Sequence, residues 1–162
     1  MSLAAQHPPQ RRRADAKGGR SPWDSEGLWQ RMSPWWPELS VEVVSRIGST
    51  NTELVERARQ VAQRTAGRGL RAGDLQPTLL IAEQQTHGKG RLGRAWQSSA
   101  ETSLTFSLAV PLQRADWSGL SLAVGLALAR ALDPQNRHVR LKWPNDLWRA
   151  DGGGKQIGRA HV

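Results

Sequence analysis

The sequence has no cysteine, no long apolar run and no apolar segment behind its first basic residues. The absence of cysteine excludes disulfide bonds, a thiol nucleophile and thiolate metal sites. A membrane-spanning helix needs roughly 18 consecutive apolar residues, and the longest candidate, Leu120 to Leu132, is too short. Without an apolar segment near the N-terminus we expect no secretory signal. Together these absences predict a soluble, cytoplasmic protein with no membrane partner.

The positive charge is concentrated at the N-terminus. The chain has 162 residues, 38% of them hydrophobic, and a net charge of +9, which suits one domain with a modest core. In the first twenty residues the only acid is Asp15, and the segment is rich in Pro, Gly and Ala. The cations there are Arg11, Arg12, Arg13, Lys17 and Arg20. This composition predicts a basic disordered tail over residues 1–20. The tail is either a nucleic-acid-binding arm or a segment without function.

Residues 21–40 form a second segment with a different composition. They hold four of the eight tryptophans: Trp23, Trp29, Trp35 and Trp36. Disordered segments are usually poor in aromatic residues, so we expect this segment to pack against the domain that follows. That domain is expected to occupy residues 41–162.

The most informative stretch is the glycine loop, from Glu83 to Trp96. Its glycines alternate with cations, in the order Gly88, Lys89, Gly90, Arg91, Gly93 and Arg94. Glycines let the backbone approach a ligand closely, and the cations supply the charge that phosphates require. The loop therefore predicts nucleotide chemistry.

The glycine spacing leaves two other interpretations. Gly88-x-Gly90-x-x-Gly93 satisfies the dinucleotide-binding fingerprint. That fingerprint needs a helix opening on the third glycine and an acid about twenty residues on, and the sequence offers neither. The second interpretation is a solvated basic turn, because runs of charge usually lie on surfaces.

A second candidate cation lies on a predicted strand. Val139 to Trp143 alternates apolar and polar residues up to Pro144, which indicates a strand that ends in a turn. With Val139, Leu141 and Trp143 on the buried face, Lys142 points the other way from a rigid element, where a catalytic cation is best held. An isolated strand lysine is more often only solvent-facing.

The remaining elements predict the fold class. Val41 to Val43 indicates a short strand before a helix that starts at a capping box of Thr50 and Glu53 and stops at Gly67. Two further strands are predicted, a fully apolar one over Thr78–Ala82 and a half-buried one over Leu104–Val110.

Ser118 to Leu132 is apolar nearly all round, which predicts a central buried helix, and Gly152 to Gly154 should turn the chain back toward Lys155. These elements predict an α+β domain with flanking helices on a mixed, largely antiparallel sheet.

Three blocks of the sequence resemble the catalytic domain of the biotin protein ligase family. They are Gly48 to Asn51, the pattern Glu83-x-Gln85-Thr86-x-Gly88-Lys89-Gly90-Arg91-x-Gly93-Arg94-x-Trp96, and Lys142-Trp143-Pro144-Asn145-Asp146. A weaker match is Lys155-x-x-Gly158. The resemblance covers about residues 41 to 158 and implies a class II synthetase-like fold that is incomplete at its C-terminus.

The resemblance also implies a reaction. Biotin and ATP, with Mg²⁺, would give biotinyl-5′-AMP, and a lysine of the biotin carboxyl carrier protein, a subunit of acetyl-CoA carboxylase, would then accept the biotin. It implies no repressor function, because forty residues are too few for the DNA-binding domain that some members carry. It leaves a homodimer open.

Site residues follow from the same resemblance. Lys142 and Arg91 are the expected catalytic residues, and no side chain is assigned to a metal. Biotin is expected to bind to Ser49, Thr50, Asn51, Gln85, Lys89, Gly90, Arg91 and Lys142. ATP is expected to bind to Gly88, Arg91, Arg94, Trp96 and Asn145. Asn145 and Asp146 would orient the nearby backbone or a metal-bound water.

The chain departs from the family pattern at two places. Lys89 stands where the family usually has arginine, which puts bidentate phosphate binding there in doubt. After Gly158 the family continues with apolar residues and a glutamate, whereas Arg159 to Val162 follows here. We therefore expect weak or absent ligation by this chain alone. The alternatives are a lipoate-type acyl ligase and a non-enzymatic, basic nucleic-acid-binding protein.

Overall fold

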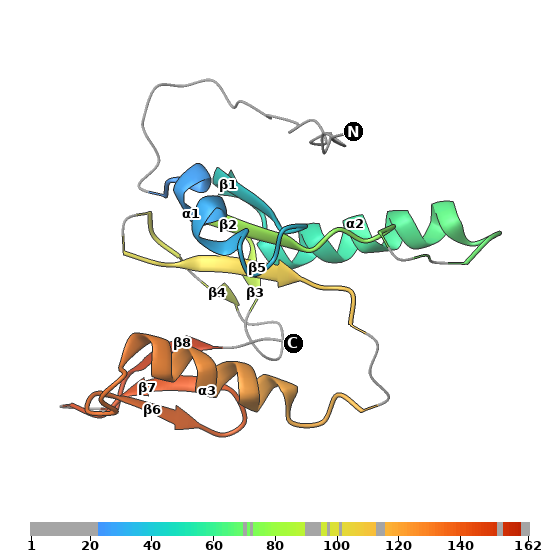
Figure 1. Ribbon diagram of the computed structural model, residues 1–162. Coiled ribbons are helices and arrows are strands. Elements are labelled where there is room, and N and C mark those ends of the chain that lie inside the picture. The colour runs from blue at the N-terminus through green and yellow to red at the C-terminus, as the bar shows by residue number, and fades with distance from the viewer. Residues whose placement is uncertain are drawn as a thin grey trace, which may run out of the picture. The chain divides into compact units, whose positions relative to one another are not determined.

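The computed structural model describes residues 23–69, 71, 73–89, 95–96, 98–100, 102–112, 116–151 and 154–159 (Figure 1). The chain forms two compact units, the first ending at Pro111 and the second beginning at Leu112. The elements in chain order are α1 (Ser25–Met32), β1 (Ser40–Ile47), α2 (Thr50–Thr65), β2 (Thr78–Gln85), β3 (Gly88–Lys89), β4 (Ala95–Trp96), β5 (Thr105–Ala109), α3 (Leu120–Leu132), β6 (Val139–Lys142), β7 (Asp146–Arg149) and β8 (Gln156–Arg159).

The first unit contains a three-stranded sheet in the order β1-β2-β5. β1 runs parallel to β2, and β5 runs antiparallel to it. Leu80 and Ala82 of the central strand β2 are completely buried, as expected for an apolar strand that is covered on both faces. β3 and β4 form a small antiparallel ribbon, and β6, β7 and β8 form an antiparallel sheet in the second unit. The predicted α+β class with a mixed, largely antiparallel sheet is confirmed.

One face of the first sheet packs against the N-terminal segment. Leu39, Leu79 and Ile81 form the buried cluster. Half-buried side chains that pack on it are Trp23, Leu28, Met32, Trp36, Val41 and Val43. The tryptophan-rich segment therefore packs against the domain, as its aromatic content predicted, although Trp35 itself is exposed.

The opposite face of the sheet carries α2. Arg57 of α2 forms an ion pair of 2.9 Å with Glu42 of β1, and Thr50 contacts Ser107 of β5. In the strand register Glu42 and Ser107 flank Leu80, so all three lie on the face that α2 covers. A helix across three strands fixes the position of its own N-terminus relative to the strand ends.

The predicted capping box was wrong by one residue. Ser49, not Thr50, is the N-cap of α2, and its hydroxyl accepts a hydrogen bond of 3.3 Å from the backbone N–H of Thr52. The Glu53 carboxylate binds Arg57 at 2.9 Å instead. Ser49 has the extended backbone that an N-cap requires, whereas Thr50 is the first helical residue. The side chain of Thr50 is therefore not used to cap the helix and can form hydrogen bonds elsewhere.

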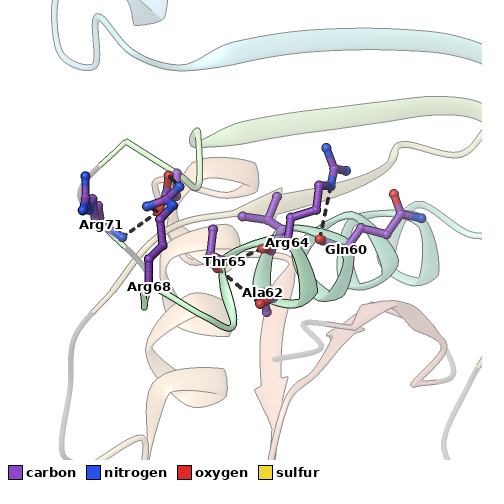
Figure 2. Close-up of polar contacts among 8 residues, drawn as sticks. Gln60, Ala62, Arg64, Thr65, Arg68 and Arg71 are labelled. Atoms are coloured by element: carbon purple, nitrogen blue, oxygen red, sulfur yellow. Dashed lines mark hydrogen bonds and ion pairs between the residues drawn. The ribbon is translucent and has the colours of Figure 1, made fainter.

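The C-terminal end of α2 is closed by local hydrogen bonds (Figure 2). The Thr65 hydroxyl donates to the carbonyl oxygen of Ala62 at 3.2 Å. Beyond the helix, Arg68 and the backbone N–H of Arg71 both donate to the Asp74 carboxylate. The hydrogen bond from Arg68 lowers the pKa of Asp74. The polar groups at this end are thus satisfied within a short stretch of chain.

The alternation of β5 was predicted correctly, but its apolar residues are the more exposed ones. Thr105 and Ser107 face α2 and are half-buried, while Phe106 is 39% exposed. Phe106 lies beside Ile81 on the face that carries the N-terminal core. However, α1 packs against β1, at the opposite edge of the sheet from β5. The apolar side of β5 therefore lies outside that core.

The helix of the second unit is less buried than its sequence predicted. In α3 only Gly125 is buried, whereas Leu122, Val124 and Leu126 are exposed. A Cβ on Gly125 would lie 2.8 Å from Leu141 Cδ1, so glycine permits the close approach of α3 to β6. The helix contacts β6 and β7, and two short strands cannot cover the whole of an apolar helix.

The predicted burial of Trp143 was also wrong. β6 ends at Lys142, and Trp143 lies in the following turn with 74% of its surface exposed. Alternation of faces holds only within a strand, so it stops where the turn begins. The turn from Trp143 to Asn145 joins β6 to β7, and β8 returns antiparallel to β7, as the glycine run predicted.

No helix in the described part of the chain combines the length and the apolar character needed to cross a membrane.

Candidate functional site

The first two sequence blocks meet where β1 and β2 end. In the parallel register Ile47 lies opposite Gln85, so the residues that follow the two strands are neighbours. The backbone N–H of His87 donates to the carbonyl oxygen of Gly48 at 2.8 Å. The start of α2 and the start of the glycine loop are thus joined through the backbone, as expected where parallel strands end at the same edge.

The side chain of Gln85 is tied to the start of α2. Its Oε1 accepts hydrogen bonds from the backbone N–H of Thr50 at 2.8 Å and from the Thr50 hydroxyl at 3.1 Å. The Ser107 hydroxyl lies 2.8 Å from the Thr50 hydroxyl. Thr50 is only 2% exposed, so these bonds are shielded from water. Two residues assigned to biotin binding are therefore directly hydrogen-bonded to each other.

The main chain of Gln85 is held as well. Its backbone N–H donates to the Ser98 hydroxyl at 2.7 Å, and Ser98 is buried. Ser98 follows β4, so this bond connects the end of β2 to the returning side of the glycine loop. Both the backbone and the amide of Gln85 are consequently fixed by groups from other elements.

Gly88 occupies a position that only glycine fits. A Cβ there would lie 2.5 Å from the carbonyl oxygen of Trp96 and 3.0 Å from Gln85 Nε2. Because the nearer atom belongs to the backbone of the paired strand β4, it cannot move aside easily. The glycine of the predicted loop is thus required for the β3–β4 ribbon to lie against Gln85.

The other predicted residues of this unit differ in accessibility. Ser49 is half-buried and accepts the cap bond, Asn51 is exposed on the first turn of α2, and Trp96 is half-buried on β4. β4, not a helix, follows the three glycines, which argues against the dinucleotide-binding interpretation. The backbone of Lys89 belongs to β3. Its side chain and the residues Gly90, Arg91 and Arg94 lie outside the described residues, so their roles stay predictions.

In the second unit, Lys142 stands at the end of β6. Its Nζ lies 4.2 Å from the centroid of the Trp148 ring, a cation–π contact. Trp148 is on β7, and the hairpin register places Lys142 opposite Asp146. A lysine opposite an aspartate would ordinarily form a cross-strand ion pair.

That ion pair does not form, because Asp146 binds Arg159. The guanidinium Nε lies 2.5 Å from Asp146 Oδ1, and Nη2 lies 3.2 Å from Oδ2. The two side chains are only 16% and 13% exposed, and the hydrogen bond to Asp146 raises the pKa of Arg159. Asp146 was expected to orient backbone or a metal-bound water, but its carboxylate neutralises Arg159. Asn145 is half-buried in the turn.

The expected Mg²⁺ has no three-ligand cluster among the described residues. They contain no group of three or more His, Cys, Asp or Glu side chains able to hold a metal ion. Asp146, the acid opposite Lys142 in the hairpin register, is engaged by Arg159.

Ser98, Ser107, Trp148 and Arg159 were missed as site residues by the sequence analysis. Ser107 was one of several small polar residues on β5, and Arg159 was noted only as a departure from the family pattern. No local signal distinguishes the serine that meets Thr50 from its neighbours, because that contact joins residues 57 positions apart in sequence.

Known proteins are similar to this chain over most of its length. Residues 46–160 match the model of the Biotin/lipoate A/B protein ligase family. The chain is 35% identical over 151 residues to the biotin–acetyl-CoA-carboxylase ligase of Mycobacterium tuberculosis, covering 86% of this chain and 50% of that protein. It is 36% identical over 115 residues to the bifunctional ligase/repressor BirA of Escherichia coli, covering 69% of this chain and 32% of BirA.

A solved structure gives the same result for the fold. The biotin acetyl coenzyme A carboxylase synthetase of Helicobacter pylori, with bound biotinylated ATP, superposes with a TM-score of 0.52 and 29% identity, covering 69% of this chain and 50% of that one. The chain spans half the length of the mycobacterial relative and a third of BirA. The family match covers most of the chain and includes all three blocks that carried the resemblance. The chain therefore belongs to the biotin/lipoate A/B protein ligase family.

Proposed function

We propose that this chain carries the biotin-binding part of an ATP-dependent ligase, which activates biotin as biotinyl-5′-AMP and transfers it to a lysine of a biotin carboxyl carrier protein. The observation that carries the proposal is the hydrogen bonding of Thr50 to Gln85, which joins the first block to the glycine loop. The relatives named for biotin and the solved structure with biotinylated ATP support the choice of substrates.

The proposed biotin site is the junction of β1, α2 and β2. Gln85 supplies a fixed amide, while Ser49 and Asn51 supply polar groups on the first turn of α2. Thr50 acts chiefly by holding Gln85, because it is buried and donates to that side chain twice. The backbone of Lys89, Gly90 and Arg91 would close over both ligands, as the family pattern implies and as a glycine in the loop permits.

The proposed nucleotide site lies along the rest of the loop. Arg91 and Arg94 would bind the ATP phosphates, since guanidinium groups pair with phosphate oxygens in bidentate fashion. Trp96 and Asn145 would lie on the nucleotide side. These assignments rest on the family pattern. A structure of the chain with bound nucleotide would test whether these four side chains contact it.

In the first step a carboxylate oxygen of biotin attacks the α-phosphorus of ATP. An O–P bond forms, the bond to the β-phosphate oxygen breaks, and pyrophosphate leaves. In the second step the carrier lysine amine attacks the acyl carbon, AMP leaves with the bonding electrons, and the new amide loses a proton. No side chain becomes covalently attached, so the protein must align two anions and neutralise their charge.

Lys142 is the proposed cation between the biotin carboxylate and the α-phosphate. A lysine is useful there only if no protein carboxylate already neutralises it. Arg159 satisfies this condition by binding Asp146, the acid opposite Lys142. The Trp148 ring holds the ammonium group without neutralising its charge.

Several finer predictions remain part of the proposal. We expect a cytoplasmic location and a carrier subunit of acetyl-CoA carboxylase as partner; a homodimer stays open. We expect Mg²⁺ to bridge the ATP phosphates, because Mg²⁺ is usually bound through substrate phosphates and one or two carboxylates. The runner-up is a lipoate-type acyl ligase, since the family model covers both substrates.

Isothermal titration of biotin into the purified chain, with and without ATP and Mg²⁺, tests the proposal. Biotin should bind, and ATP should tighten binding in the wild type but not in Lys142→Ala. Arg140→Ala is the control, because Arg140 is an exposed cation on the same strand. Binding of lipoate in preference to biotin would favour the runner-up. A folded chain that binds neither would contradict the proposed function.

A further inference from the structure

The hydrogen bonds around Thr50 have only one consistent arrangement of protons. The Thr50 hydroxyl has a single proton, and Gln85 Oε1, 3.1 Å away, can only accept. The Thr50 proton must therefore point at Gln85. The Ser107 hydroxyl, 2.8 Å from the Thr50 oxygen, must then be the donor of the second bond. The three side chains form a one-way chain, in which Ser107 donates to Thr50 and Thr50 donates to Gln85.

This arrangement fixes the orientation of the Gln85 amide. The backbone N–H of Thr50 is an obligatory donor and lies 2.8 Å from Oε1, so the oxygen of the amide must face α2. Oε1 then receives two hydrogen bonds, which fills both of its lone pairs. The amide nitrogen Nε2 necessarily points the other way.

The nitrogen faces the ribbon of the glycine loop. It lies 3.0 Å from the position that a Cβ on Gly88 would occupy. Within the part of the chain that the structure describes, no residue accepts a hydrogen bond from Nε2. Gln85 therefore presents two N–H donors beside Gly88, and the group that it binds must be a hydrogen-bond acceptor.

We propose that Ser107 is a positioning residue that fixes the Gln85 amide through Thr50, so that Gln85 selects a ligand carrying a ring carbonyl oxygen. This inference rests on the proposed function, because biotin supplies such a carbonyl in its urea ring. Ser107 belongs to β5, outside all the sequence blocks that resemble the family. Its hydroxyl acts on the ligand only through two other side chains.

The test compares biotin with 2-iminobiotin, in which a protonated imine donor replaces the ring carbonyl acceptor. A fixed donor at Gln85 should favour biotin strongly at pH 7. In Ser107→Ala the Thr50 hydroxyl loses the donor that keeps its proton directed at Gln85, so Oε1 keeps only the backbone N–H of Thr50 as a fixed donor and the amide is held less rigidly. Removing one buried hydrogen bond of this kind should reduce the preference for biotin about tenfold. Ser107→Thr keeps the hydroxyl and should restore the preference.

Thr105→Val is the matched control. Thr105 lies two residues before Ser107 on the same face of β5, is half-buried, and has no hydrogen bond from its side chain to the described residues. It should keep the wild-type preference. If Ser107→Ala weakens both ligands by the same factor, or neither, Ser107 is only structural and the inference fails.

A second measurement separates this inference from the proposed function. The side-chain ¹⁵N–¹H₂ resonances of Gln85 should report a rigid amide in the ligand-free wild type and in Thr105→Val, and increased motion in Ser107→Ala. A mobile amide in the wild type overturns the inference whether or not biotin binds. A rigid amide in a folded chain that does not bind biotin supports the positioning role and refutes the proposed function.

Discussion

Gln85 and Lys142 are the two best-defined candidate residues, and the fold holds them in opposite ways. Gln85 is neutral and receives hydrogen bonds from Thr50, while Ser98 fixes its backbone. Lys142 is charged and rests on one aromatic ring, and the acid across the strand is bound by Arg159. A neutral group needs a fixed direction to recognise its ligand, whereas a catalytic cation needs freedom from a counter-ion.

The largest expected effect comes from Gly88→Ala, which disrupts the packing of the β3–β4 ribbon against Gln85. The new Cβ would lie 2.5 Å from the backbone carbonyl of Trp96, so the β3–β4 ribbon must shift away from Gln85. We expect loss of biotin binding and a destabilisation of about 1–3 kcal/mol, the usual cost of overpacking. Titration and urea unfolding measure the two effects.

Gly67→Ala is the control for Gly88→Ala, because a Cβ at Gly67 meets nothing within 4 Å. It should bind biotin as the wild type does and unfold at a similar urea concentration. Normal biotin binding by Gly88→Ala would show that the close approach of the ribbon is not needed.

The next effect comes from giving Lys142 a counter-ion with Arg159→Ala. Removing Arg159 leaves the largely buried Asp146 carboxylate without its partner, which should destabilise the chain by about 1–3 kcal/mol. Asp146 would then be able to pair with Lys142. We expect the ATP-dependent increase in biotin affinity to fall in this variant.

The double variant Arg159→Ala with Asp146→Asn distinguishes the two effects of that change. It removes the competing carboxylate, so the ATP-dependent increase should return. If it stays low, the Asp146–Arg159 pair acts only through stability and does not control the charge of Lys142.

A smaller effect is expected when the ring under Lys142 is changed. Trp148→Phe keeps an aromatic face but weakens the cation–π contact, which is worth about 0.5–1 kcal/mol at accessible sites. Nucleotide-dependent biotin binding should weaken by a few-fold, with biotin binding in the absence of ATP unchanged. An equal loss under both conditions would show that Trp148 does not act through Lys142.

The smallest effect concerns the start of the strand that carries Lys142. Asp133 accepts hydrogen bonds from the backbone N–H groups of Val139, at 2.8 Å, and His138, at 2.6 Å. These bonds lower the pKa of Asp133 in the folded chain. Its contribution to stability is therefore present above the unfolded pKa and is lost as the pH falls through the lower, folded value.

Urea unfolding between pH 7 and pH 2 should show this loss, and Asp133→Asn should reduce it. The control is Asp24→Asn, whose carboxylate forms no cap bond to α1. An unchanged pH profile in Asp133→Asn would show that other acids account for the whole loss.

Apolar runs and alternation predicted β1, β2, β5 and β6 and with them the fold class, and the motifs of the family resemblance implied the grouping of the first two blocks; β3, β4 and β7 were not predicted. The sequence did not predict the burial of β5 and α3. Alternation identifies two faces of a strand but not which one a neighbouring helix covers, and the cover of an apolar helix depends on the partners available to it. The N-cap was misplaced because Ser49 and Thr50 are adjacent and both can cap.

The roles of Ser107 and Arg159 could not be predicted for a related reason. Each contacts a residue that is not its neighbour in sequence, at a position where many polar residues would satisfy the local pattern. Such contacts depend on strand register, which is known only from the structure.

The most direct test of the account is biotin titration into Gln85→Ala beside Gln84→Ala. Gln84 is the neighbouring glutamine on β2, with its side chain on the other face of the strand and no bond to Thr50. We predict that Gln84→Ala binds biotin like the wild type and that Gln85→Ala loses at least about tenfold in affinity, since a ligand acceptor is left unpaired. Equal binding by the two variants would contradict the assignment of this junction as the biotin site.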